Sequence, residues 1–334
     1  MREKDTYTMQ HESVDLLSQY LKIDTTNPPG NEYKGTAFFA DIFEKEAVDF
    51  TVYEPEGVSG KGRCSISARI SGSGSEEPLI LIAAAEKATN WMQVRAEGPP
   101  GHGSVPKPDN ALERLIRGLN RLQQMDNPIT ITETTAEYFK RLAEGWDFLK
   151  PYQEDGLEKT LIKCLTESGF ADIPQVSAML RNTVSTNVMA AGGSVNVIPS
   201  RAEAKLDVRI LPGQDPEAFK AMIEKQLDDD QLTVSFLTSD HALASPFDTP
   251  ELEAIEAVFR RRFPEAVITP FLVFGSTDSR FFREKGMISY GVCPVLLAMD
   301  DIQMVHGIDE KISEENMILG TEIYTEIVEK LCAL

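Results

Sequence analysis

The sequence predicts an α/β protein of two domains, with one domain inserted into the other. Its 334 residues are about twice the length of a typical domain. Both ends of the chain alternate helical and strand-like segments, whereas strand-like runs in the middle alternate apolar and polar residues, as in a sheet with one exposed face. We therefore place one domain at residues 1–84 and 245–334, and the inserted domain at residues 85–244.

Helices and strands alternate in the first and last segments, which favours one shared mixed or parallel sheet. In the first segment we expect helices over residues 14–21 and 38–46 and strands over residues 50–53, 64–70 and 79–84. In the last segment we expect a helix over residues 250–259, strands over 267–274 and 287–292, and a final helix from the cap Ser313 to about Leu331.

The middle segment predicts the order strand, helix, strand, strand, helix, strand. The strands are expected over residues 92–97, 184–189, 204–210 and 232–236. Asp109 is the expected cap of a first helix that buries Leu112, Leu115, Ile116, Leu119 and Leu122, and Asp215 of a second that buries Phe219, Met222, Ile223 and Leu227. This order is the ferredoxin-like split βαβ arrangement. Residues 134–168 add helices, in which we interpret Trp146 as a packing residue.

Charge and hydropathy exclude several classes of partner. The net charge of −20 would repel phosphate backbones and anionic lipid, so we expect neither a nucleic acid nor a membrane as a partner. The polar N-terminus does not resemble a secretory signal, and the longest apolar run, residues 79–85, is too short to span a bilayer. A cytoplasmic location is expected. The four cysteines have no CxxC spacing and are expected to be buried thiols: Cys64, Cys164, Cys293 and Cys332.

Four short motifs carry the functional signal when they are taken in order. They are Gly98-Pro-Pro-Gly-His-Gly-Ser104, Asn196-Val-Ile-Pro199 followed by Asp207-Val-Arg-Ile-Leu-Pro-Gly213, Gly275-Ser-Thr-Asp-Ser-Arg280, and His306-Gly-Ile-Asp-Glu310. Together with residues 23–32 and the pair Glu86-Lys87, this set resembles the co-catalytic zinc metallopeptidase family. That family includes aminoacylase, acetylornithine deacetylase, succinyl-diaminopimelate desuccinylase and carboxypeptidase G.

The resemblance implies a zinc-binding α/β domain with an inserted lid that also forms a homodimer. Members hydrolyse amide bonds next to a free carboxylate, using two zinc ions that lower the pKa of a bridging water. By resemblance, His306 is a metal ligand, and His102 polarises the scissile carbonyl or binds the oxyanion in the site of the partner subunit. Asn196 contacts the substrate and Arg209 clamps its carboxylate. The backbone of Gly275, Ser276 and Thr277 is placed to present N–H groups to an anion.

Each of these residues also has a purely structural interpretation. His306 could lie in a polar surface turn, and His102 and Asn196 could be loop and turn residues. Arg209 shares a strand face with Lys205 and Asp207, so it could simply form an ordinary solvated cross-strand pair. The sequence alone leaves these alternatives open.

The chain departs from the family pattern between residues 84 and 86. Family members carry a His-x-Asp ligand pair and then an acidic block here, whereas this chain passes directly from residues 79–84 to Glu86-Lys87. Because a catalytic zinc normally needs three protein ligands, His306 alone should not hold one. We therefore expect a truncated hydrolytic domain and impaired hydrolysis of peptides or N-acyl amino acids. The alternative is a non-catalytic dimer that binds a small carboxylate.

Overall fold

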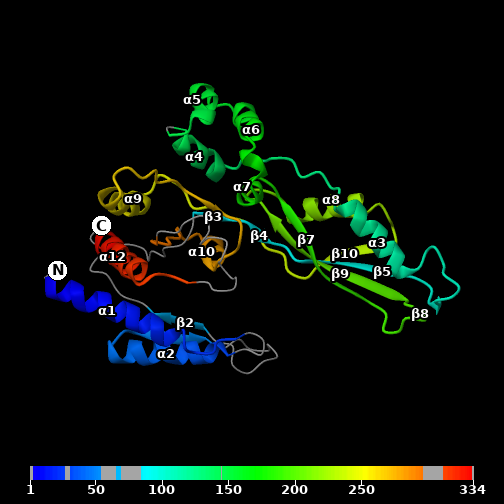
Figure 1. Cartoon of the computed structure of the whole chain (residues 1–334), viewed down its shortest axis with the longest axis horizontal. Coiled ribbons are helices and arrows are strands. Elements are labelled where there is room, and N and C mark those ends of the chain that lie inside the picture. The colour runs from blue at the N-terminus through cyan, green and yellow to red at the C-terminus, as the bar shows by residue number, and fades with distance from the viewer. Residues whose placement is uncertain are drawn as a thin grey trace. The chain divides into compact units, whose positions relative to one another are not determined.

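The computed structural model describes residues 3–26, 31–53, 65–68, 84–143, 145–295 and 311–332 (Figure 1). The described residues group into two compact units. Unit 1 lies within Met1–Glu77, Glu253–Pro264 and Cys293–Leu334, and unit 2 lies within Pro78–Leu252 and Glu265–Val292. Of the expected strand over residues 79–84, only Ala84 is described. None of the helices in the described part of the chain is long and apolar enough to cross a bilayer.

Unit 1 is a helical layer with a small sheet. Its elements are α1 (Glu3–Tyr20), α2 (Glu32–Lys45), β1 (Phe50–Tyr53), β2 (Ser65–Ala68), most of α9 (Pro250–Arg262) and α12 (Glu314–Leu331). β1 and β2 pair antiparallel, and α1 packs against α12. Ser313 caps α12 as predicted, accepting the Asn316 N–H at 3.1 Å. No described strand of the last segment pairs with β1 or β2, so the expected shared sheet is not found there.

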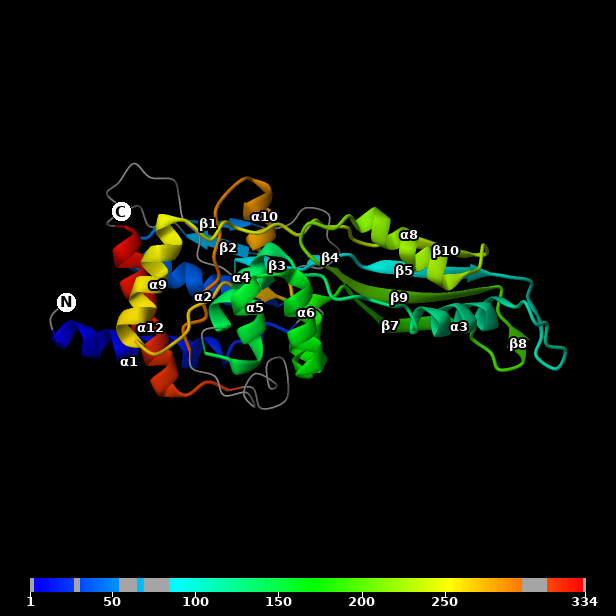
Figure 2. The ribbon, with the colours of Figure 1, turned by 90° about the horizontal axis from the view of Figure 1, so that it is seen from above.

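Unit 2 contains the predicted ferredoxin-like domain. Its strands β5 (Met92–Glu97), β7 (Thr183–Ala191), β9 (Arg201–Ile210) and β10 (Leu232–Phe236) lie in the order β10-β5-β9-β7, all antiparallel. Helices α3 (Ala111–Leu122) and α8 (Pro216–Leu227) lie side by side on one face of this sheet (Figure 2). The core between helices and sheet is formed by alternate strand residues such as Val94, Leu206 and Val208, as the sequence pattern predicts.

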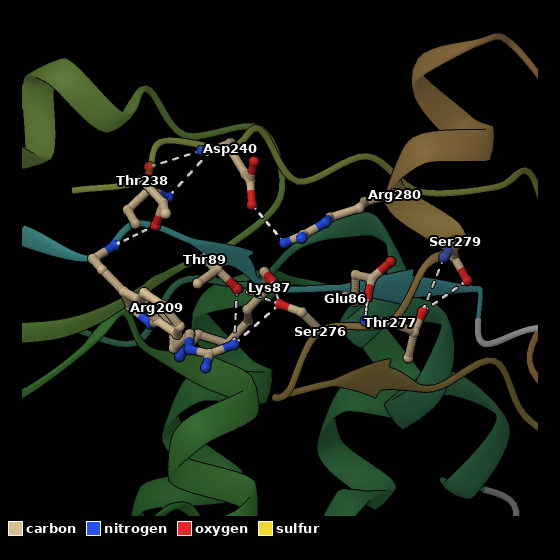
Figure 3. Close-up of polar contacts among 12 residues, drawn as sticks. Glu86, Lys87, Thr89, Arg209, Thr238, Asp240, Ser276, Thr277, Ser279 and Arg280 are labelled. Atoms are coloured by element: carbon tan, nitrogen blue, oxygen red, sulfur yellow. Dashed lines mark hydrogen bonds and ion pairs between the residues drawn. The ribbon is translucent and has the colours of Figure 1, made fainter. Parts of the chain in front are cut away.

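Two short strands extend this sheet toward the rest of unit 2. β4 (Ala88–Thr89) pairs with β9 in the same register as β5, since Ala88 lies opposite Ile210 and Met92 opposite Leu206. β4 is therefore a continuation of β5 after a break at residues 90–91. Before it, β3 (Ala85–Glu86) pairs in parallel with β11 (Leu272–Val273). This pairing brings residues 275–277 beside the start of the sheet (Figure 3).

Between α3 and β7 the chain forms a helical appendage with its own core. It contains α4 (Glu133–Leu142), α5 (Lys150–Asp155), α6 (Glu158–Glu167) and α7 (Pro174–Leu180), with short 3-10 turns at Asp147–Leu149 and Phe170–Asp172. Trp146 packs against Phe148 and Phe170, with ring centroids 5.6 and 5.1 Å away. The interpretation of Trp146 as a packing residue is therefore confirmed.

Several local predictions are wrong for identifiable reasons. Asn110, not Asp109, caps α3, because its Oδ1 accepts the Glu113 N–H at 3.0 Å. Ile116 and Met222 are 49% and 48% exposed, because the buried stripes of α3 and α8 are too narrow to include them.

The strands of the last segment and the cysteines also differ from expectation. The strand expected over residues 267–274 is reduced to β11, and over residues 287–292 the described structure has only bridge positions, at Ser289 and Gly291. Cys164 is buried as expected, but Cys293 and Cys332 are exposed, and Cys64 lies outside the described residues.

Candidate functional site

Arg209 lies near the end of β9, where its guanidinium contacts side chains from three segments (Figure 3). On one edge, Nε and NH2 donate to the two carboxylate oxygens of Asp207 at 2.7 and 3.2 Å. On the other, NH1 donates to the hydroxyl of Thr89 at 2.9 Å and to that of Ser276 at 3.0 Å. Arg209 thus forms the pair with Asp207 that its strand spacing allowed, and also joins Ser276 of the predicted anion-binding segment.

The two hydroxyls beside Arg209 are linked to each other and to the backbone. Their oxygens lie 2.5 Å apart, and the Ser276 hydroxyl donates to the carbonyl of Lys87 at 3.2 Å. Thr89 lies directly opposite Arg209 in the β4–β9 register, which fixes its position. No motif or pattern in the sequence singled out Thr89. Thr89 could have been found only as the residue opposite Arg209 on the neighbouring strand, and this requires the β4–β9 register to be known.

The backbone of the Gly275-Ser276-Thr277 turn already holds an anion from the chain itself. The Thr277 N–H donates to the carboxylate of Glu86, whose other oxygen accepts NH1 of Arg283 at 3.0 Å. Both side chains of this ion pair are 2% exposed. Arg283 also donates to the Ser245 hydroxyl and to the Ser289 carbonyl, at 3.2 and 3.0 Å. The expected N–H donor of Thr277 is therefore occupied by Glu86.

Lys87 is buried beneath this cluster and fixes the start of β7. Its ammonium donates to the carbonyls of Ala178 and Arg181 at 3.1 and 2.8 Å and to the Thr183 hydroxyl at 3.0 Å. Burial, and after it the charge of Arg209, lower the pKa of Lys87 to about 7, against the opposing effect of the charge of Asp207. The Glu86-Lys87 pair, noted in the sequence only as a motif, therefore connects three parts of unit 2.

His102 lies in β6 (Gly101–His102), which pairs antiparallel with β8 (Val197–Ile198), and Asn196 directly precedes β8. The Gly103 N–H donates to the Asn196 carbonyl at 2.8 Å, and a Cβ on Gly103 would lie 3.3 Å from that residue's backbone. The Ser104 N–H donates to Nδ1 of His102 at 3.2 Å. Because Nδ1 accepts a hydrogen bond, the neutral ring carries its proton on Nε2, which is free to donate to a carbonyl oxygen.

The two groups of predicted residues lie near opposite ends of β9: β4 pairs with Arg209 and Ile210 at its end, whereas β8 directly precedes its start (Figure 1). Arg201 begins β9 beside the β6–β8 pair, and Arg209 lies eight residues further along the strand. At about 3.3 Å per residue, the two ends are roughly 26 Å apart. His102 and Arg209 of one chain therefore cannot contact the same small ligand.

The described residues do not provide a metal site. They contain no group of three or more His, Cys, Asp or Glu side chains placed to hold a metal ion. His306 lies outside the described residues, as does the rest of its motif. Because the described side chains do not fit a zinc centre, we derive no catalytic step through one.

Comparisons with known proteins identify the inserted region directly. Residues 84–234 match the family model described as the peptidase dimerisation domain of M20 proteins. This range covers the ferredoxin-like sheet, its two helices and the helical appendage.

Curated relatives match over most of this chain but only part of their own. N-fatty-acyl-amino acid synthase/hydrolase PM20D1 of Homo sapiens is 27% identical over 259 residues, or 76% of this chain and 51% of the relative. Aminoacylase-1 of Sus scrofa is 23% identical over 270 residues, or 79% of this chain and 55% of the relative. The chain thus spans about half the length of the curated relatives it matches.

Solved structures share the fold at low sequence identity. Human carnosine dipeptidase 1 aligns with a TM-score of 0.50 at 14% identity, covering 79% of this chain and 59% of that one. The dipeptidase Dug1p of Saccharomyces cerevisiae gives 0.50 at 17%, covering 78% and 57%. The ordered motifs, the dimerisation-domain match over residues 84–234 and these curated relatives together support a place for this chain among the M20 peptidases and aminoacylases.

Proposed function

We propose that this protein is a homodimer related to amide hydrolases and that it binds N-acyl amino acids or peptides through their free carboxylate. We further propose that its own hydrolytic activity is impaired. The arrangement around Arg209 carries this proposal. A guanidinium with two hydroxyls on one edge offers several donors to a carboxylate, which is the geometry that Arg suits best. The names of the relatives, an N-fatty-acyl-amino acid hydrolase and an aminoacylase, support the same substrate class.

Asp207 positions Arg209 for this role. Its bidentate contact holds Nε and NH2, so the NH1 edge points toward Thr89 and Ser276. We propose that a bound carboxylate takes the place of one hydroxyl as the acceptor of the Nη1 hydrogen bond of Arg209. The same carboxylate would then accept hydrogen bonds from the hydroxyls of Thr89 and Ser276. The Arg209→Lys variant keeps the charge but loses the planar fork. We expect it to bind N-acetyl amino acids at least tenfold more weakly in calorimetric titration.

We propose that dimerisation takes place through β7. Among the described strands, this nine-residue strand pairs only with β9, and most of it is exposed, with Val188 and Met189 at 48% and 50%. A long, apolar edge strand is a template for pairing with another strand. Pairing two copies of β7 about a twofold axis would join the two sheets, and the dimerisation-domain match supports this.

The dimer is tested by adding charge to this edge. Val188→Lys and Met189→Lys would place like charges close together near the axis, so we expect both variants to sediment as monomers. Met222→Lys is the matched control, since Met222 is equally exposed at 48% but lies on α8. If all three variants remain dimeric, β7 is not the interface.

A dimer would also explain the position of His102 and Asn196. Because these residues cannot reach Arg209 of their own chain, we propose that they act at the site of the partner, where Nε2 of His102 donates to the ligand's amide carbonyl. His102→Gln tests this in a binding assay. It should weaken N-acetyl amino acid binding in the dimer and have no effect in a Val188→Lys monomer.

Impaired hydrolysis follows from the metal ligands that the sequence lacks. We expect purified protein to contain far less than one zinc per chain and to release no detectable amino acid from N-acyl amino acids or dipeptides, with or without chelator. Near-stoichiometric zinc that is lost in His306→Ala, together with chelator-sensitive hydrolysis, would contradict this part of the proposal. In that case the protein is an active metal-dependent hydrolase.

The second candidate function is a non-catalytic dimer that only binds a small carboxylate. The observation that favours it is the occupied turn at residues 275–277, where Glu86 already accepts the Thr277 N–H. Such a protein would bind acetate or an N-acyl amino acid with similar affinity, because only the carboxylate would be recognised. A preference of more than tenfold for the N-acyl amino acid would instead favour a site that also recognises the amide.

A further inference from the structure

The charges around Arg209 do not balance without a ligand. Among the described residues, the buried pair Glu86–Arg283 is neutral, and Arg280 is paired with Asp240 at 2.5 Å. Arg209 is paired with Asp207. Lys87 donates to three neutral oxygens, two carbonyls and a hydroxyl. When Lys87 is protonated, this cluster therefore carries one excess positive charge.

The excess positive charge of Lys87 acts electrostatically on the guanidinium of Arg209. Lys87 and Arg209 each disfavour the charge of the other, and Asp207 stabilises that of Lys87, as the causes of the lowered pKa of Lys87 indicate. A single negative charge placed on the NH1 edge of Arg209 would neutralise the cluster. A second negative charge would not be compensated, because Asp207 already occupies the opposite edge of the same guanidinium.

We propose that Asp207 and Lys87 make the Arg209 site selective for ligands with one negative charge, so that it accepts neutral N-acyl amino acids and discriminates against acidic ones. This inference rests on the carboxylate binding proposed above. It assigns Asp207 a specificity role in addition to positioning Arg209, and it assigns Thr89 a place beside Ser276 in contacting the bound carboxylate.

Two ligands of nearly identical shape test this selectivity. N-acetyl-L-glutamine carries one negative charge and N-acetyl-L-glutamate carries two, so a difference in their affinity reports mainly on charge. We expect the protein to bind the glutamine derivative about tenfold more tightly in calorimetric titration at low salt, near pH 6, where Lys87 is protonated. Asp207→Asn removes the negative charge without changing the side-chain shape and should reduce the preference to about twofold or less.

Glu203→Gln is the matched control. Glu203 pairs with Arg201 two residues away on the same strand, as Asp207 pairs with Arg209, but at the other end of β9. This variant should keep the wild-type preference. If the wild-type protein binds both ligands equally well, or if Asp207→Asn keeps the full preference, the selectivity inference is wrong.

The affinity of the Arg209→Lys variant for the two ligands tests the proposed carboxylate site separately from the selectivity. If N-acetyl-L-glutamine binds to the wild-type protein and Arg209→Lys lowers its affinity, the carboxylate site is supported, whether or not the protein prefers the glutamine derivative. If neither ligand binds to the wild-type protein, or if Arg209→Lys leaves both affinities unchanged, the carboxylate site and the selectivity inference fail together. Thr89→Val, which removes the hydroxyl at constant shape, should weaken both ligands by about threefold to tenfold.

Discussion

The Glu86→Gln substitution should destabilise unit 2 far more than its conservative chemistry suggests. Glu86 and Arg283 form an ion pair whose side chains are each only 2% exposed. The substitution keeps the size and an oxygen acceptor for the Thr277 N–H, but it leaves the guanidinium of Arg283 without a counter-charge. Burial already lowers the pKa of Arg283, and the charge of Glu86 is the main effect opposing that shift.

The magnitude follows from the cost of an unpaired buried charge. Removing one partner of a buried pair typically costs about 3–5 kcal/mol. Arg283 keeps its hydrogen bonds to Ser245 and Ser289, so we expect a loss near the lower end, about 3 kcal/mol. An exposed pair should matter little. Lys163 and Glu167 on α6 are 69% and 67% exposed, so Glu167→Gln should change the free energy of unfolding by less than about 0.5 kcal/mol.

Tryptophan fluorescence during urea denaturation measures this in the correct part of the molecule. The chain contains two tryptophans, Trp91 and Trp146, and both lie in unit 2. Glu167 also lies in unit 2, so the same signal reports both variants. A loss below about 1 kcal/mol for Glu86→Gln, similar to that of Glu167→Gln, would refute the reasoning. It would mean that solvent or a rearranged partner compensates Arg283.

Three further outcomes follow from single contacts in unit 2. Asn110→Ala should cost about 1 kcal/mol in urea denaturation because the cap of α3 is lost, whereas Asp109→Ala should cost almost nothing. Between pH 7 and 10.5, native Lys87 has released its proton but the unfolded chain still binds it, so the free energy of unfolding should rise with pH. Lys87→Met should reduce that rise by an amount on the order of 5 kcal/mol, and an unchanged slope would contradict the lowered pKa of Lys87. Gly156→Ala should cost about 1 kcal/mol, since Gly156 ends α5 with φ of 64° and nothing else crowds it.

The sequence predicted the sheet of unit 2 well because its signal is periodic and local. Alternation at residues 92–97 and 204–210 correctly identified β5 and β9, and Asp215 followed by Pro216 correctly located the start of α8. The same logic chose Asp109 over Asn110 for α3, because either residue could be the cap. Only the backbone geometry, with Asn110 extended, distinguishes them.

Contacts between distant segments could not be predicted in this way. The partners of Arg209 come from residues 89, 207 and 276, and only Asp207 is close in sequence. Likewise, the Glu86–Arg283 pair joins residues 197 positions apart. No local pattern specifies such a pairing, because it depends on the register of β4 on β9 and of β3 on β11. The family motifs marked Arg209, Ser276 and the Glu86-Lys87 pair, but they did not mark Thr89 or Arg283 and did not specify which side chains meet.

The turn at residues 275–277 shows why this difference matters for function. A glycine-containing turn after an apolar strand is a common anion-binding element, and the sequence therefore assigned its N–H groups to a ligand. In the structure the Thr277 N–H binds Glu86, and the Ser276 hydroxyl points to Arg209. The carboxylate of Glu86 thus fixes the turn, and the Ser276 side chain extends from the turn to Arg209. In the carboxylate site proposed at Arg209, ligand binding should therefore depend on Glu86, although Glu86 would not contact the ligand.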